Sequence, residues 1–308
     1  EVTGHGRNDV LDSQIAWDIE GKRRFDGLIG LSTLFKECKF GGIDVNVGIQ
    51  KSHFVINDTA WVVQPASVDI AHGKIHVNDI DVGRSGQFVK ISGVVSDNPD
   101  DVLTLNLNAM SLDYVFETLA ISNVDFGGTA TGDFYARNLM SKEPRLDTPN
   151  LHVKDFCYNK SLLGDADIVS RWDNDRKGVT IDADILQPNG RRSAVNGIIY
   201  PMAEALDFRF KADKLDVGFM KPYMEAFTSS VSGYASGDAR LFGTFKLIDM
   251  TGEIYAEDLK LKLDITNTYY STTDSIHLTP GRISFGDVTL YDDYGNKAKL
   301  DGWVTHEC

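Results

Sequence analysis

The amino-acid sequence predicts an all-β protein: one elongated, curled antiparallel sheet with a few short helices. Three observations lead to this class. Apolar and polar residues alternate over most of the chain, turn signals such as "QPNGR" and "DDYGNK" separate the alternating stretches, and the pattern recurs about every hundred residues.

Alternation marks the strands and sorts their residues onto two faces. In "VLTLNLNA" the leucines occupy every second position and polar residues fill the others. A period of two over four to eight residues is typical of a half-buried strand. The stretches "VTIDADI", "LDFRFKA", "DLKLKLDIT" and "ISF" behave alike. The apolar members are our candidate groove residues: Leu103, Leu105, Leu107, Ile181, Ile185, Phe208, Phe210, Leu259, Leu261, Leu263, Ile283 and Phe285.

The repeat is set by glycines in equivalent hairpins. Gly86, Gly190 and Gly295 are separated by 104 residues (86 to 190) and 105 residues (190 to 295), and each is followed seven residues later by a second glycine. Such periodicity predicts an array in which each repeat packs on the next. We divide the chain into repeats at 1–101, 102–205 and 206–308; the first half of the first repeat matches poorly. With no Pro/Ser-rich linker between them, we expect one continuous sheet of roughly 8 to 9 strands per repeat.

Two stretches break the β pattern and predict short helices. In "LDYVFETLA" Leu112, Val115, Phe116 and Leu119 share one helical face. The equivalent "LDVGFMKPYMEAF" carries Leu215, Phe219, Tyr223 and Phe227, with Pro222 suited to a first turn. We expect both stretches, 112–120 and 215–227, to pack on the apolar side of the sheet.

That apolar side needs a cover. A second sheet could provide it, as in a sandwich, or the sheet could curl until its own walls face each other. Because the sequence passes from repeat to repeat through short turns, it favours the curled sheet.

Composition excludes some classes of function. The chain has 308 residues, is 42% hydrophobic, and carries a net charge of −14, which argues against a nucleic-acid partner. It has no apolar run of about 20 residues and no signal peptide, and we interpret it as an internal fragment of a longer protein. Cys38, Cys157 and Cys308 form no CxxC pair, so they indicate neither a zinc site nor a redox site, and they leave the compartment open.

No pattern of residues predicts an enzyme, a cofactor or a metal. The chain lacks HExxH, GxSxG and P-loop motifs, and "GHGRND" is only part of a dinucleotide fingerprint. His72 and His76 have a metal-binding spacing for a helix, but they lie in a strand and turn. Asp292, Asp293 and Asn296 suggest either calcium or, as we favour, an acidic hairpin turn.

The order of motifs over residues 60–308 resembles the TamB family of AsmA-like envelope proteins, in the form found in Bacteroides-type bacteria. The strongest motifs are "GDARLFGTFK" (Gly237 to Lys246) and "DSIHLTP…ISFGDVTLYDDYGN". The resemblance implies a β-taco, a half-pipe with a hydrophobic concave face. It also implies a periplasmic body, an inner-membrane anchor in an N-terminal helix and an outer-membrane barrel partner bound by a C-terminal domain, with anchor and domain outside this fragment.

The apolar groove therefore carries the functional hypothesis. Such a groove suits phospholipid or acyl chains, and we expect this segment to carry phospholipid between inner and outer membrane in support of outer-membrane biogenesis. The alternative is a scaffold or assembly factor for outer-membrane proteins, whose sheet edges pair with client strands. A surface β-solenoid, such as an adhesin or a carbohydrate lyase, would show coils of about 20–30 residues, which the sequence lacks.

Overall fold

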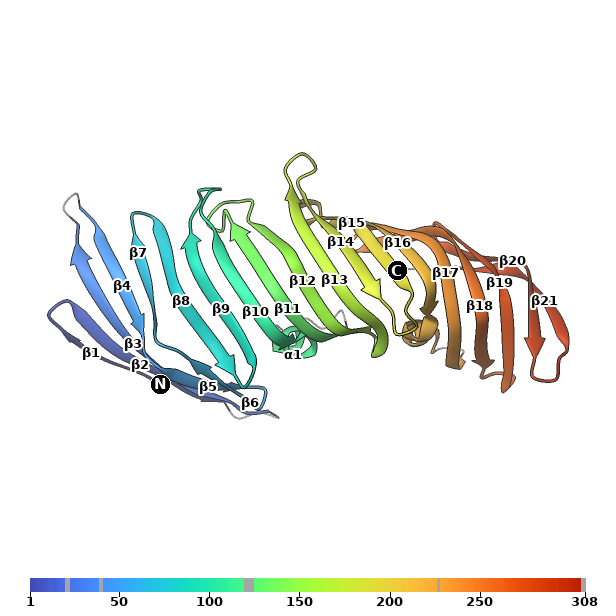
Figure 1. Cartoon of the computed structure of the whole chain (residues 1–308), viewed down its shortest axis with the longest axis horizontal. Coiled ribbons are helices and arrows are strands. Elements are labelled where there is room, and N and C mark those ends of the chain that lie inside the picture. The colour runs from blue at the N-terminus through green and yellow to red at the C-terminus, as the bar shows by residue number, and fades with distance from the viewer. Residues whose placement is uncertain (20–22, 39–40, 119–124, 226–227, 306–308) are drawn as a thin grey trace. The chain divides into compact units, whose positions relative to one another are not determined.

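The computed structural model describes residues 1–19, 23–38, 41–118, 125–225 and 228–305. Within them 21 strands belong to one antiparallel sheet, accompanied by a few short helices (Figure 1). The all-β class and the curled antiparallel sheet are confirmed. Leu119 and Phe227, which were predicted to lie in helices, and Cys308 lie outside the described residues.

The chain divides into two compact units. Unit 1 comprises Glu1–Ile121 with Ala130–Leu151, and unit 2 comprises Ser122–Thr129 with His152–Cys308. The division into three repeats stays a prediction. The three turn glycines, however, occupy equivalent hairpin turns, as the repeat predicts. Gly86 lies in the β8–β9 turn, Gly190 in the β14–β15 turn and Gly295 in the β20–β21 turn, with φ of 76°, 80° and 83°. These left-handed values favour glycine.

Unit 1 is a meander in which two long strands, β3 and β8, each pair along one edge with two shorter strands that follow one another. β4 and β5 pair in succession with the same edge of β3, and β7 and β6 pair in the same way with β8. The two breaks between these shorter strands let the sheet turn, so that β5 and β6 run beneath β7–β9 in Figure 1. The strands that begin in this unit are β1 Val2–Arg7, β2 Val10–Ile19, β3 Phe25–Glu37, β4 Ile43–Ile49, β5 Ser52–Ile56, β6 Thr59–Val63, β7 Ala66–Ala71, β8 Lys74–Arg84, β9 Gln87–Val95, β10 Leu103–Ser111 and β12 Arg145–Tyr158.

Unit 2 is an uninterrupted meander from β13 to β21, with each strand paired to its successor. Its longest strands, β17 and β18, have 17 residues each. The strands are β11 Phe126–Arg137, which ends in unit 1, then β13 Ser161–Asp173, β14 Gly178–Leu186, β15 Arg192–Tyr200, β16 Ala205–Asp216, β17 Thr228–Thr244, β18 Leu247–Leu263, β19 Thr268–Thr279, β20 Arg282–Asp292 and β21 Lys297–Thr305.

Helices form within the two stretches where the sequence predicts them, but Leu215, which was expected in the second helix, belongs to β16. α1 spans Leu112–Thr118, η2 spans Val217–Met220 and α2 spans Lys221–Met224; a further 3-10 turn, η1, spans Pro201–Ala203. Asp216 caps η2, because its carboxylate accepts the backbone N–H of Gly218 at 2.7 Å. Within the described residues, no helix has the length and apolar character that crossing a bilayer requires.

The expected number of strands is met in 1–101, whose described part holds nine strands, β1 to β9, and is wrong for the other two repeats. The described part of 102–205 holds six strands, β10 to β15, and that of 206–308 holds six, β16 to β21. The strands are longer than expected because bulges carry them through positions where alternation changes phase. β18, for example, continues through a register shift between Ala256 and Leu259, with Asp258 at a φ of 51°.

The bulges receive support from neighbouring strands. A bulged residue cannot use its backbone N–H in the ladder, so another acceptor must satisfy it. Lys214 N donates to Ser236 Oγ at 2.9 Å and Asp258 N to Thr273 Oγ1 at 3.0 Å in unit 2, while Ala109 N donates to Thr131 Oγ1 at 3.0 Å in unit 1. Ala109 and Lys214, both with positive φ, are 105 positions apart (214 minus 109), the repeat interval.

Candidate functional site: an apolar face in each unit

In unit 1 the ladder register assembles one apolar face from β3 to β10. Residues directly opposite one another in an antiparallel pair project from the same face. Leu105 of β10 lies opposite Ile91 of β9, which lies opposite Ile80 of β8. The relation continues through β7 and β4 to Phe35 of β3. The members of this unit 1 apolar face include Phe35, Val45, Val47, Val68, Ile70, Ile75, Val77, Ile80, Val82, Val89, Ile91, Leu103, Leu105 and Leu107.

In unit 2 a corresponding apolar face runs from β13 to β21. Phe208 of β16 lies opposite Gly197 of β15 on one side and Leu241 of β17 on the other. Leu261 of β18 lies opposite Val231 and Tyr270. The nine remaining candidate groove residues share this unit 2 apolar face: Ile181, Ile185, Phe208, Phe210, Leu259, Leu261, Leu263, Ile283 and Phe285.

The apolar faces are only partly covered. Of the twelve candidate groove residues, Ile185 alone is buried, at 6% exposure, and the other eleven are half-buried. A sealed core would bury most of them, because leucine, isoleucine and phenylalanine are among the residue types most often fully buried.

The accessible surface is larger than that of compact domains of the same mass. The chain, of 34.1 kDa, exposes 18485 Å². One globule of that mass would expose roughly 12,800 Å², and two separate globules of half the mass roughly 15,500 Å². The excess persists even when each unit is counted as a separate body, so the units themselves are less compact than globular domains of their size.

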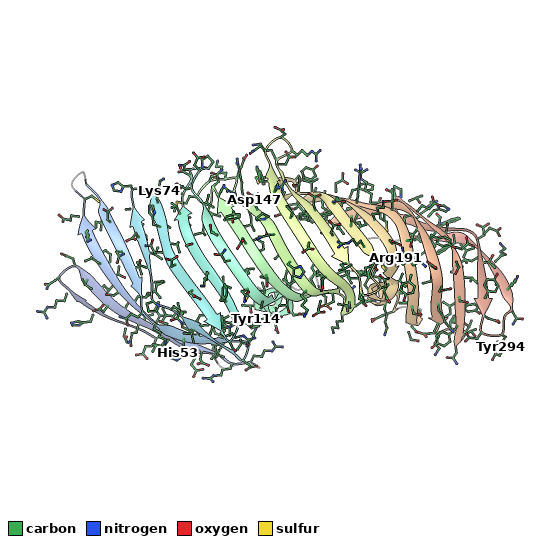
Figure 2. The ribbon with its side chains drawn as sticks, in the orientation of Figure 1. His53, Lys74, Tyr114, Asp147, Arg191 and Tyr294 are labelled. Carbon is green, nitrogen blue, oxygen red and sulfur yellow. The ribbon has the colours of Figure 1, made fainter. Side chains whose placement is uncertain are left out.

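Helix α1 packs on the unit 1 apolar face through Tyr114. Figure 2 labels Tyr114. Its hydroxyl accepts the indole N–H of Trp61 at 2.8 Å and donates to the carbonyl of Ile56 at 3.0 Å, and the rings of Trp61 and Tyr114 are 5.7 Å apart. Trp61 is 4% exposed. One end of this face therefore has an aromatic, hydrogen-bonded cover over β5 and β6.

The equivalent helices η2 and α2 attach to β12 in unit 2. The Phe219 ring lies 6.3 Å from that of Tyr158, and Asn159 Nδ2 donates to the Phe219 carbonyl at 3.1 Å. The Tyr158 hydroxyl also contacts that of Tyr223. Burial, followed by this contact, raises the pKa of Tyr158 to about 12, so the phenol stays neutral at any physiological pH. Both Phe116 and Phe219 are half-buried.

Sequence reasoning did not single out Trp61, Tyr114 or Tyr158 as contacts of these helices. These contacts join residues that are far apart in the sequence: Trp61 and Tyr114 are separated by 53 residues, and Tyr158 and Tyr223 by 65 residues. The available signal was positional: Tyr114 lies next to the predicted helical face, and an aromatic residue with a polar end usually finds a hydrogen-bond partner when buried.

The opposite face of each unit is polar and carries cross-strand hydrogen bonds. Asp133 accepts from Asn106 at 2.5 Å and from Asn150 at 2.9 Å. The Asn150 contact, then the Asn106 contact, lowers the pKa of the Asp133 carboxyl. Asp69 is held in the same way by Asn46 and Asn78, which lower its pKa. Alternation thus separates an apolar face from a hydrated one on the same strands.

The histidine and acidic patterns resolve into local structure. His72 lies in the β7–β8 turn with a φ of 51°, whereas His76 lies within β8 opposite Asp69, so their spacing is not helical. At the β20–β21 turn the Asp292 carboxylate accepts three hydrogen bonds. One comes from the backbone N–H of Tyr294, and two come from Asn296, from its backbone N–H and from its side-chain Nδ2, each at 2.8 Å. The Asn296 side chain is the leading cause that lowers the pKa of Asp292.

Comparison with known proteins adds little. No protein-family model matches the chain, and no solved structure matches it. Among curated proteins the chain is similar to the protein jagged-2 of Rattus norvegicus, Homo sapiens and Mus musculus, with 34% identity over 64 residues in each case. This stretch covers 21% of the chain and 5% of each jagged-2 protein, so it does not establish a family.

Proposed function

We propose that the chain is a segment of an envelope protein whose apolar faces carry phospholipid, one acyl chain beside another, between the inner and the outer membrane. The observation that carries the proposal is the continuous register of half-buried apolar residues from strand to strand within each unit. Outer-membrane biogenesis, a periplasmic location, an inner-membrane anchor and an outer-membrane barrel partner rest on the resemblance to TamB and AsmA-like proteins.

The energetics favour such a path. Moving an acyl chain through water costs about 0.8 kcal/mol for every CH₂ exposed, so a two-tailed phospholipid faces a barrier of tens of kcal/mol. A half-buried apolar stripe offsets that cost without any chemical step, and the polar face of the same strands keeps contact with water. A sealed core could not do this, because its side chains are already covered.

Photocrosslinking at adjacent positions of one strand tests the proposal. A benzophenone amino acid replaces Phe208 on the unit 2 apolar face, and the matched control replaces its neighbour Arg209, which alternation places on the polar face. We expect phospholipid adducts, identified by mass spectrometry, at position 208 and not at 209. Equal adducts at both positions, or none at 208, would contradict the proposal.

A second candidate function is strand pairing with an outer-membrane protein. It is favoured by β21, which pairs on one side only, with β20, among the described strands and exposes 62% of Trp303 and 54% of Val304. An unpaired strand edge with apolar side chains is a template for another strand. Benzophenone at Trp303 distinguishes the two: protein adducts there, without lipid adducts at position 208, would favour the scaffold function.

A further inference from the structure

Three metal-ligating side chains meet at one rim of unit 1. Cys38 directly follows β3, Asp44 lies near the start of β4, and His72 is in the β7–β8 turn. The Cys38 Sγ, an Asp44 carboxylate oxygen and a His72 ring nitrogen all lie within 4.8 Å of one another. Lys74, two residues after His72, marks this rim in Figure 2.

The backbone holds the three residues in place. Cys38 N donates to the Gly42 carbonyl at 3.1 Å, which closes the β3–β4 connection beside Asp44. β4 pairs with β3 on one side and with β7 on the other, so the end of β7 is adjacent to the start of β4. The two-residue turn His72–Gly73, with φ of 51° and 75°, then places the imidazole at the same rim.

The donor set suits a borderline-soft divalent cation. Thiolate, imidazole and carboxylate are the ligand types that zinc prefers, and a site with three protein ligands leaves a fourth position for water. In tetrahedral zinc geometry the ligand atoms are about 3.3 to 3.8 Å apart, a separation set by bond lengths of about 2.0 to 2.3 Å. The present separation of up to 4.8 Å requires a closure of about 1 Å. His72 is exposed and Cys38 and Asp44 are half-buried, so side-chain rotation can provide that closure.

We propose that Cys38, Asp44 and His72 bind one divalent transition metal of the zinc class at this rim. In the metal-free protein the Cys38 thiol donates to the Asp44 carboxylate, and that contact, followed by burial, raises the pKa of Cys38. The cation replaces this thiol proton, which is released to solvent, and the resulting thiolate and the carboxylate become its ligands together with neutral imidazole.

The site is independent of lipid transport. Asp44 and Asn46 alternate with Ile43, Val45 and Val47 along β4, so Asp44 belongs to the polar face, away from the unit 1 apolar face. A bound metal would fasten the β3–β4 connection to the β7–β8 turn. Its role is therefore to stabilise the curled end of unit 1.

Cobalt(II) titration of the reduced, metal-free 308-residue chain tests the proposal. A thiolate ligand produces a near-ultraviolet charge-transfer band, and zinc should displace the cobalt and remove the band. The double variant Cys157→Ser/Cys308→Ser, which leaves Cys38 as the single thiol, should keep the band at one metal per chain. Cys38→Ser should lose the band, and Asp44→Asn and His72→Gln should bind at least 10- to 100-fold more weakly, the loss typical of disturbing a ligand's support.

Far-UV circular dichroism verifies that each variant folds, and His76→Gln serves as the matched histidine control, with unchanged binding expected. A band that persists in Cys38→Ser, or that disappears in the Cys157→Ser/Cys308→Ser variant, would overturn the proposal. So would the absence of any cobalt or zinc binding by the wild-type chain in dialysis followed by metal analysis.

Discussion

Replacing Leu261 by arginine places a charge in the middle of the unit 2 apolar face. Leu261 lies in β18, with Val231 of β17 and Tyr270 of β19 directly opposite it on either side. It is half-buried. The effect of this substitution on stability and on lipid crosslinking therefore distinguishes an open path from a sealed core.

The two cases differ in the size of the stability loss. Full burial of a leucine side chain stabilises by about 1.5–3 kcal/mol, so losing a half-buried one should cost about 1 kcal/mol. The arginine stem can cover apolar surface while its guanidinium reaches water. We expect the melting temperature to fall by about 2–4 °C for each kcal/mol lost. In a sealed core an unpaired charge would cost about 3–5 kcal/mol.

Two variants calibrate the measurement. Ile185→Arg changes a residue of the same face that is 6% exposed, and it should show the larger, core-like loss. Tyr255→Arg introduces the same charge on the polar face of β18, where Tyr255 is 46% exposed, and it should leave stability nearly unchanged.

Function is read by lipid photocrosslinking on both sides of the substitution, at Phe208 in β16 and at Phe285 in β20. Leu261→Arg should reduce lipid adducts at whichever of these two positions lipid reaches only by crossing β18. Tyr255→Arg should leave the adducts at both positions unchanged. A Leu261→Arg protein that melts as expected and still crosslinks lipid equally at both positions would refute the path. Outright unfolding would show that the face is a closed core.

Three further predictions follow from the contacts. Gly197→Ala should destabilise by about 1–3 kcal/mol in chemical denaturation, because its Cβ would lie 2.4 Å from the Phe208 ring, whereas Gly286→Ala, with open space around it, should be neutral. Tyr114→Phe removes both hydrogen bonds that tie α1 to β5 and β6 and should cost about 1–3 kcal/mol, seen as faster amide exchange in α1; Tyr294→Phe, 88% exposed, is its control. The folded-state pKa of Asp133 lies below its unfolded value, so its contribution is present above about pH 4 and lost as the pH falls through the folded pKa; Asp133→Asn should lower the melting temperature at pH 7 and converge with wild type in acid.

The phase of alternation explains what sequence reasoning obtained and what it missed in the strands. "IYAE" and the "DLKLKL" part of "DLKLKLDIT" belong to one strand, β18, but the bulge at Asp258 moves the apolar positions from Ile254 and Ala256 to Leu259 and Leu261. A bulge adds one residue, so it shifts the apolar set by one position in the sequence while keeping it on the same face. Read locally, such a strand resembles two shorter ones, which is why too many strands were expected.

For helix α1 the sequence predicted the element itself but not the residues that it contacts. The period of Leu112, Val115 and Phe116 is local, and α1 forms where that period predicts it. The residues that α1 contacts are not local in the sequence. Trp61 contacts Tyr114 because the pairing of β6 with β8 places the β5–β6 hairpin at the end of the apolar face. Helical spacing identifies a face, but it does not identify what covers that face.

The sequence by itself determined the all-β class, the two faces within each alternating stretch and the hairpin turns, since side-chain period and turn chemistry depend on neighbouring residues. The tertiary structure alone decided how far each apolar face is covered, where the bulges bend the strands, and which distant side chains meet. Eleven of the twelve candidate groove residues remain half-buried although their pattern would suit a dry core equally well. Cys38, Asp44 and His72 come together only because β4 lies between β3 and β7 in the sheet, and strand order is a long-range property that no local period encodes.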